Sequence, residues 1–522
     1  MLTIDRKTKD DVVDICLDTI RIKKQSIVFV GTKKSAEASA EKIASKLERC
    51  EESAKLSEKI EKALSTPTKQ CKRLSKTLQK GIAFHHSGLS TKQRRIVEEE
   101  FRAGTIKIIC STTTLGAGLD LPAFRTIIRD LKRFSPGWGS VPIPVLEYEQ
   151  MAGRAGRPKY DSEGQAICIA TTTEEKEQYW NEYINGKPED ITSKLAVEPV
   201  LRIHTLSLIS SGYANSFQTL MNFLAQTFYA HQYKDTEKIE YLVQQVIEML
   251  EEYEFITSTK QKTHFFSASK KQDFEIKPTK LGIRVSQLYL DPITANELIE
   301  GMKLANKKTN TFPILQLICT ANEMRPLMNP RRKEQELIEN KIIQEHEELL
   351  TQEQSTYSDE YYEYIASIKT AIVLEEWMNE KQEDYILEEY NITPGELNTK
   401  IERANWLLYS AQELARITPK IKKENLDLHV IRERLVKGIK EELMPLVKLK
   451  GIGRVRARKL YNNRIRTVKD IKKTDLATLT ELIGQKNALD IKKQVGQNLT
   501  AEKIITKPNK RKGQKNLNDY DK

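Results

Sequence analysis

Two short apolar runs, SIVFVG (residues 26–31) and TIKIICST (residues 105–112), constrain the fold of this chain most strongly. Each has the length and β-branched composition of a buried strand, and SAEASAEKIASKL (residues 35–47) between them has a helical pattern. Strands that alternate with helices are typical of a parallel sheet, because parallel neighbours need a crossover connection. Residues from about 10 to 190 are therefore predicted to form a parallel α/β domain.

Beyond about residue 195 the strand pattern nearly disappears and amphipathic helices predominate. One β-like interruption, at residues 264–266 and 273–279, is typical of a winged-helix module. A polar stretch rich in Glu and Lys, residues 329–357, predicts a long solvated helix. The last segment, from about residue 501, is rich in Lys and poor in apolar residues, so we expect a disordered tail. The predicted fold class is multidomain, α/β followed by mainly α.

The composition favours a polyanionic partner. Lys and Arg number 85 against 73 Asp and Glu, a net charge of +12, although a Lys-rich protein without such a partner would look similar. The six cysteines show neither paired spacing nor a zinc pattern, which predicts a reducing, cytoplasmic location and no metal bound by the chain itself. No apolar run is long enough to span a bilayer, so no membrane partner is expected.

Three blocks suggest phosphate chemistry: AFHHSGL (residues 83–89), STTTLGAGLDLP (residues 111–122) and QMAGRAGR (residues 150–157). In the second block, small residues let the backbone approach a ligand, and the hydroxyls of Thr113 and Thr114 can hold a phosphate. In the third, Arg154 and Arg157 stand on a small-residue scaffold in a spacing that suits a triphosphate. The alternative is that these arginines form surface ion pairs on a helix.

In this order and spacing the blocks resemble motifs IV to VI of superfamily II helicases. The chain is similar to the archaeal Hjm-type DNA helicases of the Ski-like group, and the resemblance covers nearly the whole chain. The segments that carry the resemblance are VFVGTKKSAE, AFHHSGLS, TTTLGAGLDLPAFRTIIRDLKRF and PVLEYEQMAGRAGRPKYD. It implies five parts: a second RecA-like domain, a winged helix, a helical ratchet domain, a helix-hairpin-helix domain, and a basic tail. Their expected ranges are residues 1–192, 193–290, 291–430, 431–500 and 501–522.

The resemblance also implies roles for single residues at the nucleotide. ATP with Mg²⁺ lies between two RecA-like domains in this family, and Arg157 is expected to be the arginine finger. Arg154 is expected to contact phosphate beside it. Gln150 is expected to be a coupling residue at the interface between the two RecA-like domains. Gly118 and Asp120 fall where motif V contacts nucleotide, although Asp120 stands where Asn is expected in many members.

The phosphate-binding loop that should complete this site is missing from the sequence. No G-x-x-x-x-G-K-[ST] occurs, and the only Gly-Lys pair, Gly186-Lys187, is followed by Pro188. The family places this loop, and its acidic box, in the first RecA-like domain. We therefore expect the chain to share ATP with a separate polypeptide that carries that domain, and to be inactive alone. A truncated gene product, or a DNA-binding portion without a motor, would also lack the loop.

A hairpin is expected between the second and third blocks. TIIRDLKRF (residues 126–134) and VPIPVLEY (residues 141–148) are strand-like, and SPGWGS (residues 135–140) between them marks a turn. In similar helicases a hairpin here splits the duplex, so Phe134 and Trp138 are expected to stack on the last base pair. Packing of these aromatics on the domain surface is the alternative.

A later helix has a clear start. Thr393 at the N-cap and Glu396 three residues on form a capping box at the start of a predicted helix, residues 394–417. In the family the corresponding ratchet helix runs along single-stranded DNA, which implies that Trp406 stacks on a base. The relatives' arginine two turns earlier is replaced by Thr399, so Lys400 or Arg403 is expected to contact DNA in its place. A Trp packed in the core is the alternative.

The stretch LVKLKGIGRVRARKLYNNRIRTVKDI (residues 446–471) fits a helix-hairpin-helix without any analogy. Gly451 and Gly453 let the N–H groups of a helix N-terminus grip a phosphate, and Arg454 and Arg456 add charge. Such binding is independent of sequence and weakens with salt. A protein-contact role is the alternative.

The tail contains QKNLNDY (residues 514–520), which resembles the peptide that docks into sliding clamps. Gln514, Leu517 and Tyr520 would carry that contact, although the second aromatic usual in the motif is absent.

Two functions remain open from the sequence. One is the C-terminal part of a 3′–5′ ATP-dependent helicase acting on single-stranded and forked or branched DNA, in replication restart and recombinational repair. The other is a non-catalytic DNA-binding or clamp-adaptor protein. RNA is a weaker substrate hypothesis, because the helix-hairpin-helix favours DNA.

Overall fold

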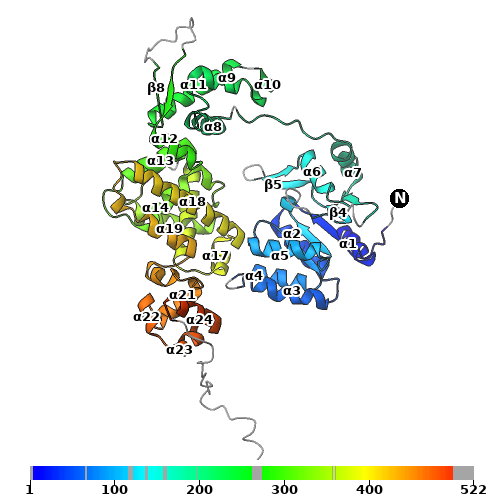
Figure 1. The fold of residues 1–522 in the computed structure, drawn as a ribbon. Coiled ribbons are helices and arrows are strands. Elements are labelled where there is room, and N and C mark those ends of the chain that lie inside the picture. Colours follow the sequence, from blue (N-terminus) through cyan, green and yellow to red (C-terminus); the bar gives the residue numbers. More distant parts are fainter. Residues whose placement is uncertain are drawn as a thin grey trace, which may run out of the picture. The chain divides into compact units, whose positions relative to one another are not determined.

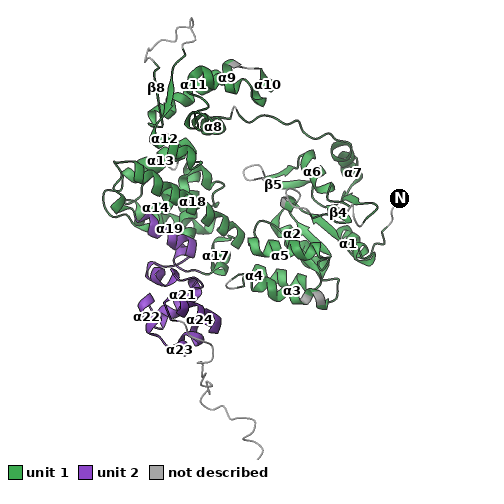
Figure 2. Cartoon of the chain, viewed as in Figure 1, with its two compact units in different colours: residues 1–374, 382–426 green, residues 375–381, 427–522 purple. Residues whose placement is uncertain are grey.

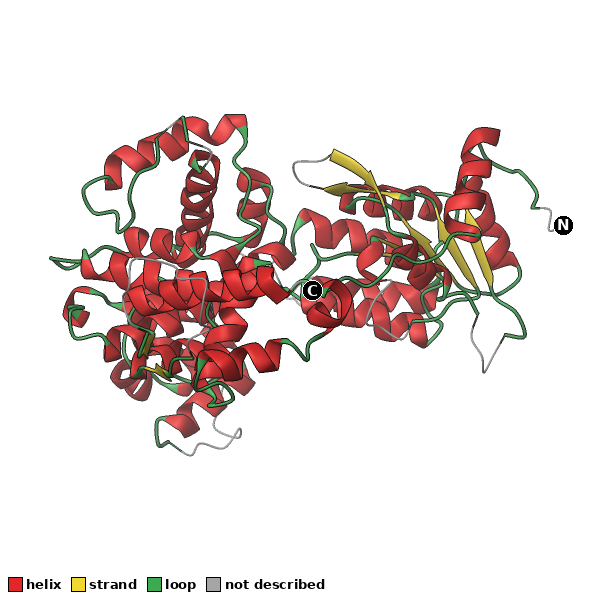
Figure 3. Cartoon of the chain, turned by 90° about the horizontal axis from the view of Figure 1, so that it is seen from above, coloured by secondary structure: helices red, strands yellow, loops and turns green. Residues whose placement is uncertain are grey.

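The computed structural model describes residues 4–64, 67–115, 121–135, 139–156, 161–195, 197–234, 236–260, 273–355, 357–358 and 360–497. Figure 1 shows the helices and strands in chain order, and Figure 2 shows the two compact units into which the chain divides. The first comprises residues 1–374 and 382–426, and the second comprises residues 375–381 and 427–522. Figure 3 shows the strands gathered mainly in the N-terminal part of the first unit, whereas helices make up most of the rest of the chain.

The N-terminal part of the first unit contains a five-stranded parallel sheet with the order β2-β3-β1-β4-β7. Its register pairs Ser26 of the central strand with Ile108 on one side and Arg125 on the other. The sheet confirms the predicted parallel α/β fold, and two of its strands lie where the sequence predicts them. The strands are β1 (Ser26–Phe29), β2 (Ile82–His85), β3 (Ile108–Ser111), β4 (Arg125–Ile128) and β7 (Gln165–Cys168).

Burial explains why these strands are continuous apolar runs instead of alternating ones. Every residue of β1, β2, β3 and β4 is buried, as expected for a parallel sheet covered by helices. Phe29, Phe84 and Phe101 are among the largest side chains of this core. The helices of the domain are α1 (Asp11–Arg21), α2 (Lys33–Ala44), α3 (Glu51–Glu61), α4 (Lys69–Leu78), α5 (Thr91–Arg102), α6 (Val145–Ala152) and α7 (Thr173–Tyr179), which a π-helical turn, Trp180–Ile184, extends.

One charged side chain lies inside this core. The Arg125 guanidinium, at the start of β4, is 2% exposed and donates to Asp18 Oδ2 at 2.6 Å, to Thr19 Oγ1 at 3.0 Å and to Gln165 Oε1 at 2.7 Å. Burial alone would raise the pKa of Asp18, but hydrogen bonds from Arg125 and Arg21 outweigh it and lower that pKa. The ion pair therefore joins α1 to the sheet.

The predicted hairpin is present, but its second strand is shorter than expected. Strand β5 (Lys132–Ser135) pairs antiparallel with β6 (Gly139–Pro142), and Phe134 stands opposite Ser140. The expectation that residues 141–148 are all strand-like is wrong, because α6 begins at Val145. Pro144 has the extended backbone of a helix N-cap, which ends the strand.

After the α/β domain comes a helical module with a small wing. Strands β8 (Ile256–Ser258) and β9 (Ile276–Pro278) pair antiparallel. Strand β9 lies at one of the two places where the sequence shows a β-like interruption, whereas β8 lies before both of them. The other place, residues 264–266, lies outside the described residues. The helices are α8 (Glu198–Ser210), α9 (Phe217–Leu224), α10 (Phe228–Tyr233), α11 (Thr236–Glu252) and α12 (Lys280–Gln287).

The rest of the first unit is helical. The expectation of one long solvated helix over residues 329–357 is wrong, because α15 spans only Gln335–Glu345 and buries Ile338 and Ile342. Ile338 and Ile342 lie on one face of the helix and are buried, although the polar composition of the segment predicts a solvated helix. The other helices are α13 (Pro292–Lys303), α14 (Thr311–Thr320), α16 (Tyr361–Met378), α17 (Glu383–Tyr390) and α18 (Pro394–Ile417), with short 3₁₀ turns η3 (Asn322–Met324), η4 (Arg332–Glu334) and η5 (Lys423–Asn425).

The second unit has its own apolar core, to which Ile452, Leu460, Leu479 and Ile491 contribute. The C-terminal end of α16 belongs to it, because the Trp377 indole N–H donates to the Leu435 carbonyl oxygen at 2.8 Å. Its remaining helices are α19 (Leu428–Lys437), α20 (Met444–Val447), α21 (Arg454–Asn462), α22 (Val468–Lys473), α23 (Leu476–Ile483) and α24 (Gln485–Gln494), with a 3₁₀ turn, Glu441–Leu443, before α20.

Removing the buried guanidinium should weaken the α/β domain. We expect Arg125→Met to lower the opening free energy of β1 and β4 by about 3 kcal/mol, because it leaves the Asp18 carboxylate without its buried partner. Hydrogen exchange of peptides from these strands in the intact chain measures this. Arg95→Met, which breaks an exposed pair with Glu99 on α5, is the matched control and should leave exchange unchanged. Equal effects of the two substitutions would contradict the role of burial.

Candidate nucleotide and nucleic-acid interface

The residue directly after the second phosphate block pairs with the third block through backbone hydrogen bonds. The Ala123 N–H donates to the Arg154 carbonyl oxygen at 2.9 Å, and the Gly156 N–H donates to the Ala123 carbonyl oxygen at 2.7 Å. Ala123 and Ala155 thus form a short parallel bridge. The residues that follow the motif V loop therefore lie directly beside motif VI.

Glycines make this close packing possible. Gly156 has a φ of +88°, a conformation that L side chains rarely adopt. A Cβ on Gly164 would lie 2.3 Å from the Gly156 nitrogen and 2.4 Å from the Ala155 carbonyl carbon. The segment that leads into β7 can pack against motif VI only because residue 164 has no side chain.

The structure places part of the expected nucleotide site. Gln150 lies on α6 and is exposed, and Arg154 follows the end of that helix and is half-buried. Arg157, Gly118 and Asp120 lie outside the described residues. Their expected roles stay predictions.

The two threonines of motif V lie where β3 ends. Thr113 begins a 3₁₀ turn, η1 (Thr113–Leu115), and is half-buried, whereas Leu115 is buried in the core. Thr114 belongs to the same turn, and its side chain is not among those described. Because all strands of the sheet are parallel, this turn shares one edge with the carboxyl ends of β1 and β4.

A cavity of about 660 Å³ lies at that edge. Strands β1 and β4 are neighbours, but the chain leaves them toward opposite ends of the sheet, and ligands bind at such switch points in open α/β sheets. Both signs of charge line it: the cations are Lys9, Arg129 and Lys132, and the carboxylates are Asp10, Asp11, Asp130 and Glu175. None of the three phosphate blocks in the sequence includes these residues, and the small-residue turn after β1 is the local signal that points to them.

This edge is held together by one carboxylate. Asp130, just after β4, accepts the Gly31 N–H at 2.8 Å and forms a bidentate ion pair with Arg129. A Cβ on Gly31 would lie 2.4 Å from the Lys132 carbonyl oxygen, so the ends of β1 and β4 approach closely. Thr32 then caps α2, because its hydroxyl oxygen accepts the Ser35 N–H.

The duplex-separating role expected for the hairpin is not tested by its geometry. Trp138 lies outside the described residues, and Phe134 is part of β5 without a described side chain. The wedge stays a prediction.

Helix α18 carries the residues expected to contact single-stranded DNA, and both are engaged within the chain. Trp406 is half-buried, and its indole N–H donates to the Leu288 carbonyl oxygen at 3.1 Å. The Arg403 guanidinium donates to the Arg325 carbonyl oxygen. Lys400, which is buried, donates to the Met324 and Pro326 carbonyl oxygens, and burial lowers its pKa to about 8. Lys400 is therefore a structural residue.

The predicted helix-hairpin-helix is present in the second unit. Gly453 is the N-cap residue of α21, and a side chain at this position would meet only open space. Arg456 is exposed and donates to the Gly451 carbonyl oxygen at 2.9 Å. The Arg454 guanidinium lies 4.3 Å from the centre of the Trp377 ring, so it also packs within the unit.

A second hairpin follows, which the sequence motifs did not predict. Helices α23 and α24 are joined at Gly484, which has a φ of +83°. Ala488 on α24 is buried, in the same way as Ala457 on α21. The signal was weak, because Ile483-Gly484-Gln485 has one glycine where the first hairpin has two.

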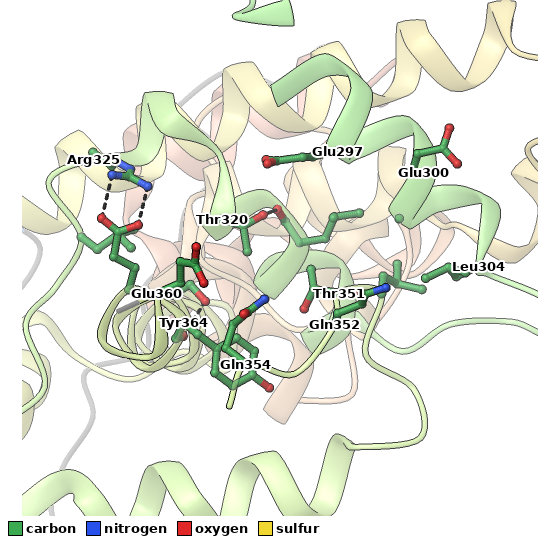
Figure 4. Close-up of a pocket in the computed structure, with 16 residues that line it drawn as sticks. Glu297, Glu300, Leu304, Thr320, Arg325, Thr351, Gln352, Gln354, Glu360 and Tyr364 are labelled. Atoms are coloured by element: carbon green, nitrogen blue, oxygen red, sulfur yellow. Dashed lines mark hydrogen bonds and ion pairs between the residues drawn. The ribbon is translucent and has the colours of Figure 1, made fainter. Parts of the chain in front are cut away.

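A second cavity, of about 620 Å³ in the helical part of the first unit, does not suit nucleic acid (Figure 4). Its lining includes Glu297, Glu300, Glu360 and Glu363. Arg325, the one cation among the lining residues, forms a bidentate pair with Glu363. Burial and neighbouring carboxylates raise the pKa of Glu297. The excess of negative charge would repel phosphates.

Two polar side chains, Gln150 and Arg154, lie at and just after the end of α6, beside the glycine turn. A glutamine and an arginine beside a glycine turn are donors suited to phosphate oxygens. Within the described ranges, no group of three His, Cys, Asp or Glu residues could hold a metal ion. Nor does any helix in that part of the chain have the length and apolar character needed to cross a membrane.

Comparison with known families agrees with this arrangement. The model of the helicase conserved C-terminal domain matches residues 8–159, the model of domain 4 of archaeal helicases matches residues 312–438, and the model of a SAM-like helix-hairpin-helix tandem matches residues 443–496. The last match includes both hairpins of the second unit.

Among similar proteins, two named ATP-dependent DNA helicase Hel308 align along most of the chain. The protein from Methanocella arvoryzae is 37% identical over 509 residues, which cover 95% of this chain and 66% of the relative. The protein from Pyrococcus horikoshii is 38% identical over 502 residues, which cover 95% of this chain and 67% of the relative. The chain thus spans about two thirds of the length of these relatives.

These matches confirm the resemblance and the fold class expected from the sequence: a RecA-like parallel sheet, mainly helical domains and a helix-hairpin-helix tandem. The chain belongs to the Hel308 family of archaeal ATP-dependent DNA helicases.

Proposed function

We propose that the chain is the DNA-translocating part of a 3′–5′ helicase that unwinds forked or branched DNA in replication restart and recombinational repair. A first RecA-like domain completes its ATP site. The observation that carries this proposal is the backbone pairing of Ala123 with Arg154 and Gly156, because it holds motifs V and VI together as a shared nucleotide contact needs.

The arginines supply charge to the phosphoryl group that is transferred. A guanidinium offers a planar fork of donors to the equatorial oxygens, and it needs no rearrangement if its backbone is already held in place. The bridge to Ala123 holds the backbone at Arg154, three residues before Arg157. ATP with Mg²⁺, when bound, supplies the phosphoryl group, and Gln150 on the exposed face of α6 would sense its presence.

A non-catalytic DNA-binding or clamp-adaptor protein is the second candidate. The second unit favours it, because it has its own apolar core and an exposed Arg456 beside a glycine turn. This unit could bind DNA without any nucleotide. The clamp peptide with Gln514, Leu517 and Tyr520 lies outside the described residues and stays a prediction.

ATP hydrolysis in a reconstituted mixture separates the two candidates. We expect DNA-stimulated hydrolysis only when the chain is mixed with a polypeptide that carries the first RecA-like domain. Arg157→Ala should lower that rate by about 10³-fold, because an arginine finger acts on the transition state. Arg95→Ala, on the exposed face of α5, is the control and should have no effect. A mixture that binds DNA and never hydrolyses ATP would favour the adaptor.

Two arginines on one helix test the hairpin contact with phosphate. Arg456 is exposed, whereas Arg458 pairs with Glu380 at 2.6 Å and Glu442 at 2.8 Å. Arg456→Gln should weaken DNA binding and reduce the slope of log affinity against log salt by about 1, because one phosphate contact is lost. Arg458→Gln should leave the slope unchanged and reduce the stability of the second unit. Identical slopes for the Arg456 variant and the wild type would refute the contact.

Trp406 can be tested as a base platform and as an anchor separately. If its ring stacks on a base, Trp406→Phe should keep affinity for single-stranded DNA, whereas Trp406→Ala should weaken it by about 1–3 kcal/mol. If its main role is the hydrogen bond to Leu288, the two variants should lose affinity equally, because neither can donate it. Titration with a fluorescent oligonucleotide distinguishes these outcomes.

A further inference from the structure

The loop after β2 meets the start of α18 through two glycines. The Gly395 N–H donates to the Gly88 carbonyl oxygen at 3.0 Å. A Cβ on Gly395 would lie 2.1 Å from the Ser87 carbonyl oxygen and 2.5 Å from the Leu89 carbonyl oxygen. Both are backbone atoms, which cannot rotate away as a side chain can. The contact therefore requires glycine at position 395.

The other side of the contact is equally close. A Cβ on Gly88 would lie 3.0 Å from the hydroxyl oxygen of Thr393, the N-cap residue of α18. The Glu396 carboxylate accepts the Thr393 N–H at 3.0 Å, as the predicted capping box requires. The helix start and the loop thus fit against each other with little room for adjustment.

An ion pair closes this contact. Lys33 Nζ, at the start of α2, lies 2.5 Å from Glu396 Oε1. Burial alone would raise the pKa of Glu396, but the charge of Lys33 and the hydrogen bonds from Lys33 and Thr393 outweigh it and lower that pKa. One carboxylate therefore caps α18 and joins it to the first turn of α2.

The RecA-like side of the contact is rigid because a buried polar network holds it. Gly88 donates its N–H to His86 Nδ1 at 3.1 Å, and the His86 ring is fully buried. His86 Nε2 lies 3.3 Å from the Glu37 carboxylate, which also accepts from Gln70 at 2.7 Å. The loop that touches α18 is thus tied to α2 and α4.

A second, more exposed contact lies beside the first. The backbone N–H of Lys69, the first residue of α4, donates to Asp384 Oδ1 on α17 at 2.9 Å, and the Lys69 ammonium pairs with Glu388. Two helices of the RecA-like domain, α2 and α4, therefore each contact the segment formed by α17 and α18.

Farther along, α18 is fastened to other parts of the first unit. Trp406 donates to the Leu288 carbonyl oxygen, and Glu413 pairs with Arg284 of α12 at 2.5 Å. A displacement of the helix at its first turn would therefore be carried along its length to the position of Trp406.

We propose that Gly88, Gly395, Lys33 and Glu396 form a rigid joint that transmits movement of the RecA-like domain to α18. We call these four residues the glycine joint. They are positioning residues, because they act on DNA only through the placement of α18. The transmission rests on the proposed helicase function, whereas the mechanical connection does not.

The connection is tested by hydrogen exchange of the intact chain without nucleotide. Gly395→Ala should raise exchange about tenfold in peptides from residues 82–90 and from the first turns of α18, because the new methyl group separates the two backbones. Asn398→Ala, on the exposed face of the same helix, is the control. A Gly395→Ala chain in which only the α18 peptides change would overturn the joint, since the loop would then be held independently.

The transmission is tested by coupling in the mixture that hydrolyses ATP. Gly395→Ala and Lys33→Met should retain DNA-stimulated hydrolysis and should consume several-fold more ATP per base pair unwound. Lys34→Met, the exposed neighbour on α2, should behave as the wild type. Unchanged coupling in both joint variants would overturn the transmission. If the wild-type mixture never hydrolyses ATP, the helicase function and the transmission both fail, while hydrogen exchange still decides whether the two elements are joined.

Discussion

The backbone pairing of Ala123 with Arg154 and Gly156 is the interaction on which the candidate nucleotide site depends. It joins two segments about thirty residues apart in the chain. It positions the backbone of motif VI, so the side chains of the motif do not take part in the pairing. Gly156 and Gly164 permit it, because a side chain at either place would be strained or would overlap backbone. Arginines that meet a phosphoryl group must be positioned beforehand, and a main-chain bridge does this without using their donors.

Helix α18 connects several elements of the first unit. Its first turn contacts the RecA-like domain, its middle is fastened by Lys400 and Trp406, and its far end pairs with α12. The indole N–H of Trp406 lies at the ring edge, so its bond to Leu288 does not itself use the ring face. Anchoring and base stacking are therefore compatible roles for one side chain. The acidic cavity of the same region suits neither phosphate nor nucleotide.

Features set by neighbouring residues were predicted well. The two buried strands, the capping interaction of Glu396 with Thr393 and the first helix-hairpin-helix follow from short-range rules of burial, capping and turn chemistry. Prediction failed where packing between distant segments decides the outcome. The polar stretch around α15 forms a short helix with a buried Ile pair, and the second hairpin has a single glycine, so its local pattern was too weak to detect.

The sequence by itself determined the family, the order of the motifs, and the residue types that can meet phosphate, because these depend on identity and spacing along the chain. Only the tertiary structure decided which of those residues come together. It showed that motif VI is bridged to Ala123, that Lys400 and Arg458 are committed to partners within the chain, and that Gly395 fits against Gly88. The physical reason is that such contacts join atoms remote in sequence, and their fit depends on the shape of both partners, which no local pattern encodes.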